Sequence, residues 1–130
     1  IAMREYGEAI GIAFQIRDDI LDFLGTESTI GKPVGADLKE KKFTLPLIHA
    51  FGNAPSSRRK VVIRLLKNGV DRKDIEHIVE FVQEFGGIAH SERVAEEYHL
   101  AAVKQLECFP DSPAKQSLID LAAFVVTRAK

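Results

Sequence analysis

Apolar residues recur at intervals of three and four along this chain of 130 residues, the spacing of one face of an α-helix. Glycine, proline and helix-capping residues interrupt the pattern at the ends of each such stretch. No alternation of apolar and polar residues competes with it, and the sequence has no internal repeat or low-complexity tract. The sequence therefore predicts an all-α protein.

The caps and breaks set the expected helix bounds. The predicted helices run from about Ala2 to Leu24, from near Thr44 to Gly52, from a cap at Ser56 or Ser57 to Asn68–Gly69, from a cap at Asp71 to Gly86–Gly87, from roughly Ile88 to Cys108, and from a cap at Ser112 onward, with Pro113 in the first position. The residues expected on buried faces are Ile10, Phe14, Leu21 and Leu24 in the first helix, Ile75, Ile78, Val79, Val82 and Phe85 in the fourth, Ala95, Tyr98, Ala102 and Leu106 in the fifth, and Leu118, Leu121, Ala122 and Val125 in the last.

Composition narrows the class of protein. Hydrophobic residues make up 45% of the chain, enough to build a core, and residues 1–130 suit a single all-α domain. With 18 basic and 19 acidic residues the net charge is −1, which predicts no nucleic-acid partner. No stretch approaches 18 continuous apolar residues, so we expect no stable membrane insertion. Cys108 is the only cysteine, which favours a reducing compartment such as the cytoplasm.

Three aspartates end the first predicted helix. Asp18 and Asp22 lie four residues apart, so both project from one helix face, and Asp19 lies about 100° around the helix from Asp18. Gly25 is expected just past the helix end, which places the carboxylates in the last two turns, where the helix dipole is already negative. A divalent cation would remove this repulsion, and ligands that are all oxygen suit Mg²⁺ better than Zn²⁺. The pattern indicates a Mg²⁺ site.

A glycine-rich segment and a group of lysines follow the aspartates. They comprise Gly25, Gly31, Lys32, Pro33, Gly35, Lys39, Lys41 and Lys42. Glycines let backbone N–H groups approach an anion closely, and lysine offers phosphate a mobile point charge. A long segment of this kind inside a compact domain is more often functional than not. Carboxylates that hold a metal, next to lysines that hold phosphate, indicate a metal-bridged diphosphate site.

Each of these patterns has a simpler interpretation when it stands alone. A DDxxD on a helix is usually a solvated acidic face, clustered lysines are usually solvated surface, and the segment lacks the GxxxxGK[ST] pattern of a P-loop. The third predicted helix also has a basic side, for which a solvated face is favoured over contact with a membrane surface. This side consists of Arg58, Arg59, Lys60, Arg64 and Lys67. The joint occurrence of aspartates, glycines and lysines in this order is what favours the diphosphate site.

At these residues the chain resembles the trans-isoprenyl diphosphate synthases, the polyprenyl synthetase family. The second aspartate-rich motif of that family reads G-x-x-F-Q-x-x-D-D-x-x-D and is matched by Gly11, Phe14, Gln15, Asp18, Asp19 and Asp22. The family pattern continues G-K-x-x-G-x-D-L-x-x-x-K-x-T-L-P and is matched by Gly31, Lys32, Gly35, Asp37, Leu38, Lys42, Thr44, Leu45 and Pro46. Residues 86–130 resemble the closing pair of helices. The resemblance implies a helical bundle, the C-terminal part of an isoprenoid synthase fold.

The resemblance also implies a reaction. An allylic prenyl diphosphate loses its diphosphate, the double bond of isopentenyl diphosphate attacks the resulting carbocation, and loss of a proton leaves a longer trans-polyprenyl diphosphate. Mg²⁺ and lysines stabilise the charge that gathers on the leaving group, while an apolar cavity keeps water from the cation.

Roles for individual residues follow from the matched positions. Asp18 is the expected direct metal ligand, and Asp19 and Asp22 act directly or through metal-bound water. Lys32 and Lys42, rather than Lys41, are expected to hold the allylic diphosphate. Gln15 is expected near the reacting groups and Phe14 along the prenyl channel. Asp37 either orients a lysine or caps the next segment, and the sequence does not distinguish these roles.

The first aspartate-rich motif of the family is not among these 130 residues. The chain therefore resembles the C-terminal portion of a longer synthase, with a homodimeric parent, and the portion alone is expected to be inactive. Three alternatives remain: a class I terpene cyclase, a non-catalytic subunit of a heteromeric synthase, and a plain helical interaction domain. Product chain length depends on residues near the absent motif, so the sequence does not give it.

Overall fold

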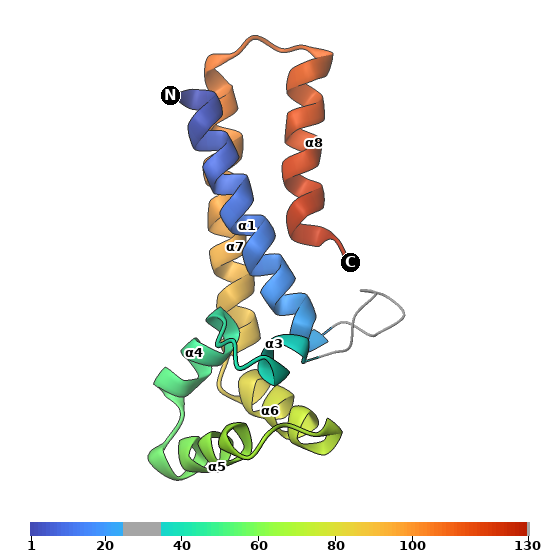
Figure 1. Cartoon of the computed structure of the whole chain (residues 1–130). Coiled ribbons are helices and arrows are strands. Elements are labelled where there is room, and N and C mark those ends of the chain that lie inside the picture. Colours follow the sequence, from blue (N-terminus) through green and yellow to red (C-terminus); the bar gives the residue numbers. More distant parts are fainter. Residues whose placement is uncertain (25–34, 130) are drawn as a thin grey trace. The chain divides into compact units, whose positions relative to one another are not determined.

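The computed structural model describes residues 1–24 and 35–129, and every regular element in these ranges is helical. The all-α prediction is confirmed (Figure 1). The chain divides into two compact units, which are described separately below. Unit 1 consists of Ile1–Asp18 and Glu92–Arg128, and unit 2 consists mainly of Asp19–Ser91.

Unit 1 is formed by the first part of helix α1 (Ala2–Leu24), most of α7 (Gly87–Gln105), the short 3₁₀ turn η1 (Leu106–Cys108) and α8 (Pro113–Thr127). Its buried core contains Tyr6, Ala9, Ala102, Leu106 and Ala122. The three alanines let the helix backbones approach closely, and the Tyr6 hydroxyl donates a hydrogen bond of 2.6 Å to the carbonyl oxygen of Leu118. Burial raises the pKa of Tyr6, which keeps this hydroxyl protonated as a donor.

Unit 2 contains the end of α1 and the short helices α3 (Ala36–Lys39), α4 (Leu45–Asn53), α5 (Ser56–Lys67) and α6 (Arg72–Glu84). Its core is larger and consists of Phe23, Leu38, Leu47, Ala50, Ala54, Val62, Leu66, Ile78, Phe81 and Val82. One member comes from the end of α1 and one from α3, so this core holds those two elements against α4, α5 and α6.

Several predicted helix ends are confirmed because their signals are local. The Asp71 carboxylate accepts a hydrogen bond from the Asp74 backbone N–H, and the Asp74 carboxylate accepts one from the Asp71 N–H, which makes a capping box for α6. At α8 the Ser112 hydroxyl oxygen accepts a hydrogen bond from the Lys115 backbone N–H, which caps the helix directly before Pro113. The serine cap predicted for α5 is wrong: Pro55 occupies the cap position, and α5 begins at Ser56 without a side-chain cap. The four-residue helix α3 was not predicted, because it is too short for any periodic signal.

The buried face of α1 differs from the prediction. Phe14 and Leu24 are 46% and 42% exposed, whereas Ala9, Ala13 and Ile20 are buried. Leu21 is buried as predicted, and Tyr6, Ile16 and Phe23 are buried as well, so α1 packs through both large and small residues. Leu121 of α8 is likewise 47% exposed, not buried as predicted. In α6 and α7 the faces expected to be buried are buried or partly buried.

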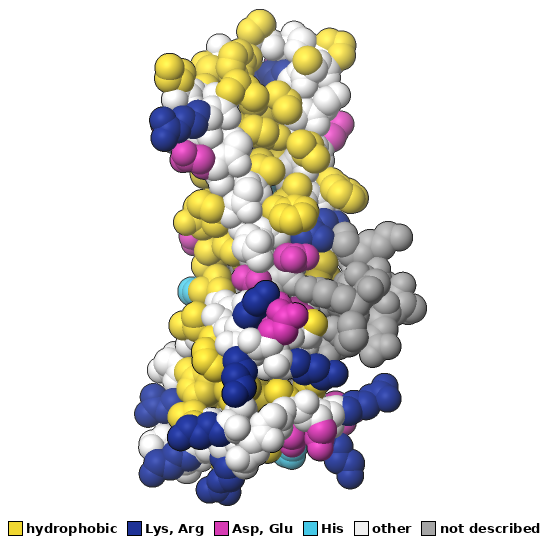
Figure 2. Space-filling view, in the orientation of Figure 1, with side chains coloured by type: hydrophobic (Ala, Val, Ile, Leu, Met, Phe, Trp, Pro, Cys, Tyr) yellow, Lys and Arg dark blue, Asp and Glu magenta, His cyan; other side chains and the backbone are white. Residues whose placement is uncertain are grey.

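None of the described helices is long and apolar enough to cross a membrane. Lysine and arginine side chains gather on the short helices of unit 2 in the space-filling view (Figure 2). Two members of the predicted basic side of α5 are engaged within that unit. Arg58 pairs with Glu84 of α6, and Arg59 donates to the carbonyl oxygen of Phe51.

Candidate active site

The last two turns of α1 carry the three predicted metal ligands, and no basic side chain lies in the final turn to offset them. Their exposure is unequal. Asp18 and Asp19 are half-buried, whereas Asp22 is fully buried at 0% exposure. Half-buried carboxylates at the negative end of a helix suit a divalent cation, because both their charge and their oxygen atoms match it.

Asp18 lies against the end of the chain in unit 1. One oxygen of its carboxylate is 3.5 Å from Nη2 of Arg128, and the side chain of Asp18 is 41% exposed. The guanidinium of Arg128 also stacks over the ring of Phe14, with its central carbon 4.2 Å from the ring centroid. The structure thus brings Asp18 and Phe14 together through an arginine that the sequence did not single out.

Asp22 connects the end of α1 to α3 within unit 2. Its Oδ2 accepts a hydrogen bond of 3.3 Å from the backbone N–H of Asp37, and its carbonyl oxygen accepts one of 2.9 Å from the N–H of Gly35. Gly35 has a φ of 79° and lies so close to Ile75 that a Cβ would be 2.8 Å from a methyl carbon of that side chain. Only glycine fits this turn without strain. The carboxylate of Asp22 therefore caps α3 from outside the helix.

Asp37 occupies the first turn of α3, where its negative charge complements the helix dipole. Its carbonyl oxygen accepts a hydrogen bond of 2.7 Å from the backbone N–H of Lys42. The backbone contacts of Asp37 are structural, while the charge of its carboxylate contributes to the raised pKa of Lys42, so both roles open for Asp37 stay predictions.

Lys42 is exposed and lies 2.9 Å from the Glu40 carboxylate. The hydrogen bond and charge of Glu40 raise the pKa of Lys42 above its ordinary value, so the ammonium group is fully protonated near neutral pH. Glu40, a residue that the sequence reasoning did not include, would therefore compete with a diphosphate for the ammonium group of Lys42.

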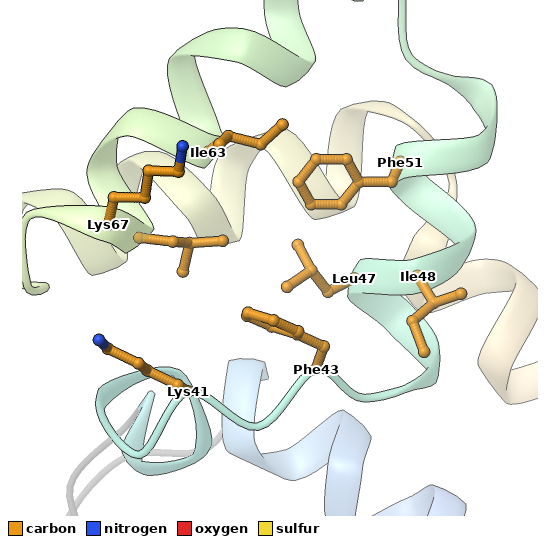
Figure 3. Close-up of a pocket in the computed structure, with 8 residues that line it drawn as sticks. Lys41, Phe43, Leu47, Ile48, Phe51, Ile63 and Lys67 are labelled. Atoms are coloured by element: carbon orange, nitrogen blue, oxygen red, sulfur yellow. The ribbon is translucent and has the colours of Figure 1, made fainter.

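The neighbouring Lys41 has different surroundings (Figure 3). Its backbone has a φ of 58°, unusual for a residue other than glycine, and its N–H donates to the carbonyl oxygen of Leu38. Its side chain lines an apolar groove of about 470 Å³, on the same side as Lys67. The other lining residues are Phe43, Leu47, Ile48, Phe51, Ile63 and Leu66. Lys42 does not line this groove, so the two adjacent lysines serve different surfaces.

The remaining predicted residues are less informative. Lys32, with the rest of residues 25–34, lies outside the described residues. Gln15 is exposed on α1. In the parts of the chain that the structure describes, no group of three histidine, cysteine, aspartate or glutamate side chains is arranged to hold a metal ion. Convergence of the three aspartates on one ion therefore stays a prediction, while the oxygen donors and exposure of Asp18 and Asp19 fit such an ion.

The helical architecture with an aspartate-rich helix end places the chain among proteins of the isoprenoid synthase fold. Residues 1–82 match the polyprenyl synthetase family, and the chain belongs to that family. The structure is similar to a polyprenyl synthase from Caulobacter crescentus CB15 that was solved with calcium and isoprenyl diphosphate. That comparison has a TM-score of 0.93 and 32% identity, over 99% of this chain and 40% of that one.

The relatives found by sequence comparison are also prenyl diphosphate synthases. The chain is 36% identical to a short chain isoprenyl diphosphate synthase from Methanothermobacter thermautotrophicus, over 98% of this chain and 39% of the relative. It is 38% identical to decaprenyl-diphosphate synthase subunit 1 of Schizosaccharomyces pombe, over 99% of this chain and 33% of that protein. The chain thus spans between about a third and two fifths of the length of these relatives.

Proposed function

We propose that this chain supplies the second aspartate-rich motif and diphosphate-binding lysines of a trans-polyprenyl diphosphate synthase. The enzyme would condense an allylic prenyl diphosphate with isopentenyl diphosphate. The observation that carries the proposal is the set of hydrogen bonds in which Asp22 of α1 caps α3 and Asp37 of α3 accepts from the Lys42 backbone. These bonds tie the residues that lead to Lys42 to the helix end that carries the aspartates, and a metal-bridged diphosphate needs both kinds of group close together.

The chain's own residues would act on charge and position. Lys42, after leaving Glu40, would face the oxygens of the departing diphosphate and stabilise the charge that gathers there. Lys32 would contact the same group. The exposed ring of Phe14 would line the path of the prenyl tail and exclude water from the carbocation, and Gln15 would lie beside the reacting carbons.

Asp18 would be the direct ligand of Mg²⁺, with Asp19 and Asp22 acting directly or through metal-bound water. When bound, Mg²⁺ would neutralise negative charge on the leaving diphosphate. The fully buried carboxylate of Asp22 favours the indirect route for that residue. The calcium ion of the Caulobacter crescentus synthase supports a divalent cation in this family.

The assembly and location are also proposals. A homodimeric parent in the cytoplasm is the simplest arrangement, although other relatives bear chloroplastic or mitochondrial names. Because the chain matches the polyprenyl synthetase family, we do not propose that its parent is a terpene cyclase. A non-catalytic subunit is the second candidate, because one relative is named as a subunit of its synthase.

Substitution of Asp18 in the enzyme that contains this chain tests the proposal. We expect Asp18→Ala to lower kcat by at least about a hundredfold, because a cation positioned at Asp18 acts when the diphosphate leaves. Lys32→Ala should chiefly weaken binding of the allylic substrate, with a smaller fall in kcat. Wild-type activity in Asp18→Ala would refute the catalytic proposal. An inactive wild-type protein that still enhances a partner synthase would support the subunit alternative.

A further inference from the structure

Arg128, the residue directly after α8, contacts α1 through both its backbone and its side chain. Its backbone carbonyl oxygen accepts a hydrogen bond of 2.9 Å from Nε of Arg17, and its own N–H donates to the carbonyl oxygen of Phe124. Its side chain reaches back along α1, where Nη2 donates to the carbonyl oxygen of Phe14 over 3.2 Å. All of these residues belong to unit 1.

The guanidinium of Arg128 is buried, and in the part of the chain that the structure describes its charge is offset by the carboxylate of Asp18. The side chain is only 7% exposed, its planar group stacks on the Phe14 ring, and the acidic group that it contacts is Asp18 at 3.5 Å. A buried cation requires a counter-ion, which Asp18 supplies. The buried Nε of Arg128 has no hydrogen-bond partner among the described residues, so the contact is not a saturated structural bridge.

We propose that Arg128 is the resident counter-ion of Asp18 and sets the affinity of this carboxylate for a divalent cation. The inference rests on the proposed metal role of Asp18. A cation and the guanidinium compete for the same carboxylate charge, and they repel each other at close range. At a separation of about 6 Å this repulsion weakens cation binding roughly tenfold even in a water-like medium. Arg128 is thus a positioning residue that keeps Asp18 neutralised until the cation arrives with its diphosphate.

Titration of Mg²⁺ alone into the 130-residue chain tests the inference. We expect Arg128→Gln to bind Mg²⁺ at the aspartates about tenfold more tightly than the wild type. Arg128→Lys, which retains the charge, should restore an affinity close to that of the wild type. Lys104→Gln is the matched control, because it removes the same charge from the exposed surface of α7. The helix turn after Lys104 packs near Tyr6 and Ala9, more than about 10 Å along α1 from Asp18, so screening should leave binding unchanged.

NMR spectroscopy can follow the contact between Arg128 and Asp18 directly. In ¹⁵N NMR spectra the Nη–H signals of Arg128 should exchange slowly with solvent in the wild type, because Nη2 donates to Phe14 and contacts Asp18. They should shift in Asp18→Asn and also when Mg²⁺ is added to the wild type. A purely structural role predicts Nη–H signals that Mg²⁺ leaves unchanged, and that result would overturn the inference.

The outcomes separate the two proposals. Mg²⁺ binding that depends on Asp18 but is equal in wild type and Arg128→Gln would overturn the counter-ion role and leave the metal role intact. Binding that is absent from both chains would count against the metal role of Asp18 and against this inference together. Tighter binding in Arg128→Gln that Asp18→Asn abolishes in the double variant would support both.

Discussion

At the scale of single residues, the aspartates of one short motif have different surroundings. Asp18 faces a guanidinium, Asp19 is half-buried, and Asp22 is buried with its carboxylate on the backbone of α3. Spacing alone treats them as equivalent, since all three lie near the same helix end. The burial and hydrogen bond of Asp22 argue that it contributes to stability, whereas the position of Asp19 near the negative end of α1 predicts that its charge adds repulsion there.

Substitutions at Asp19 and Asp22 should therefore have opposite effects on stability. We expect Asp22→Ala to lower the free energy of unfolding by about 1–3 kcal/mol, because the N–H of Asp37 loses a buried acceptor. Asp22→Asn keeps an acceptor oxygen and should lose less. Asp19→Asn, measured without metal, should be neutral or slightly stabilising, since it removes charge repulsion. Denaturant unfolding of the three variants checks this, and a loss above about 2 kcal/mol for Asp19→Asn would assign Asp19 a structural role instead.

The two adjacent lysines offer a second comparison, in the enzyme that contains this chain. Lys42→Ala should lower kcat/KM by about tenfold or more, because a charged contact to the diphosphate is lost. Lys41→Ala should have little effect, since Lys41 lines the apolar groove. Steady-state kinetics under saturating Mg²⁺ measures both. Equal damage from the two substitutions would mean that the positions matched to the family pattern in this segment are misassigned.

A third prediction at the residue scale concerns Glu40, the ion-pair partner of Lys42. Because Glu40 pairs with Lys42 at 2.9 Å, Glu40→Gln should release the ammonium group and strengthen binding of an allylic diphosphate by a few fold. The pKa of Lys42 should fall back toward its ordinary value without leaving the range in which lysine is charged at neutral pH. The dissociation constant of the diphosphate in Glu40→Gln is the decisive measurement, and weaker binding would show that Glu40 orients Lys42 for the ligand.

At the scale of helices, close packing between α4 and the start of α7 depends on Gly87. A Cβ at this position would overlap the carbonyl oxygen of Pro46 and lie 2.8 Å from a methyl carbon of Val82. Gly87→Ala should therefore destabilise unit 2 by about 1–3 kcal/mol or more. Gly7→Ala is the matched control, because no atom lies within 4 Å of a Cβ built there in α1, and it should stabilise that helix by about 0.5–1 kcal/mol. Thermal unfolding by circular dichroism compares them, and equal effects would contradict the packing argument.

Helices α5 and α6 are joined by a surface ion pair. The two terminal nitrogens of the Arg58 guanidinium, Nη1 and Nη2, contact Glu84 at 3.2 and 2.6 Å, and the same guanidinium lies over the ring of Phe85. The hydrogen bond from Arg58 lowers the pKa of Glu84 below its ordinary value of 4.5. The folded state then holds the carboxylate more readily deprotonated than the unfolded state does. The stabilisation is present above the unfolded pKa and is lost as the pH falls through the lowered folded pKa.

Thermal unfolding of Glu84→Gln against the wild type should show this pH dependence. The Tm of the wild type should be slightly higher at pH 7, and the difference should shrink below about pH 4.5. A difference that stays constant from neutral to acid pH would mean that packing of the side chain on Phe85, rather than charge, accounts for the effect.

The helices themselves were largely predictable because their end signals are local. Asp71 and Ser112 act on backbone groups three residues away, so sequence spacing is enough to identify them. The buried face of α1 was not predictable in the same way. It includes the small residues Ala9 and Ala13 and leaves Phe14 exposed, and the partner helices that decide this lie far away in the sequence.

In the candidate site, too, most residues that are close together in sequence were predicted and the distant one was missed. The aspartates and lysines of residues 18–42 were found from spacing and family pattern, because they are close in sequence. Arg128 was missed because it is separated from Asp18 by 110 positions, and no local motif marks it. Glu40 was missed because the family pattern leaves its position open.

At the scale of the whole molecule, the catalytic proposal requires more than these 130 residues contain. Departure of a diphosphate beside a growing carbocation needs positive charge around the leaving oxygens and an apolar cavity around the prenyl chain. The sequence contains one aspartate-rich motif, and the chain spans 39% of the Methanothermobacter thermautotrophicus relative. Phe14 is 46% exposed, and among the described residues its ring is covered only in part, by the guanidinium of Arg128.

We therefore expect the 130-residue chain alone to produce no elongated prenyl diphosphate. The assay combines the chain with allylic and isopentenyl diphosphates and Mg²⁺, and it measures extractable prenyl product. The full-length Methanothermobacter thermautotrophicus synthase serves as the positive control under the same conditions. Folding of the chain is checked in parallel by its helical circular dichroism, so that inactivity is not confused with unfolding. Product formed at a rate comparable to that of the control would mean that one aspartate-rich motif suffices for the reaction, because the first aspartate-rich motif of the family would then be dispensable.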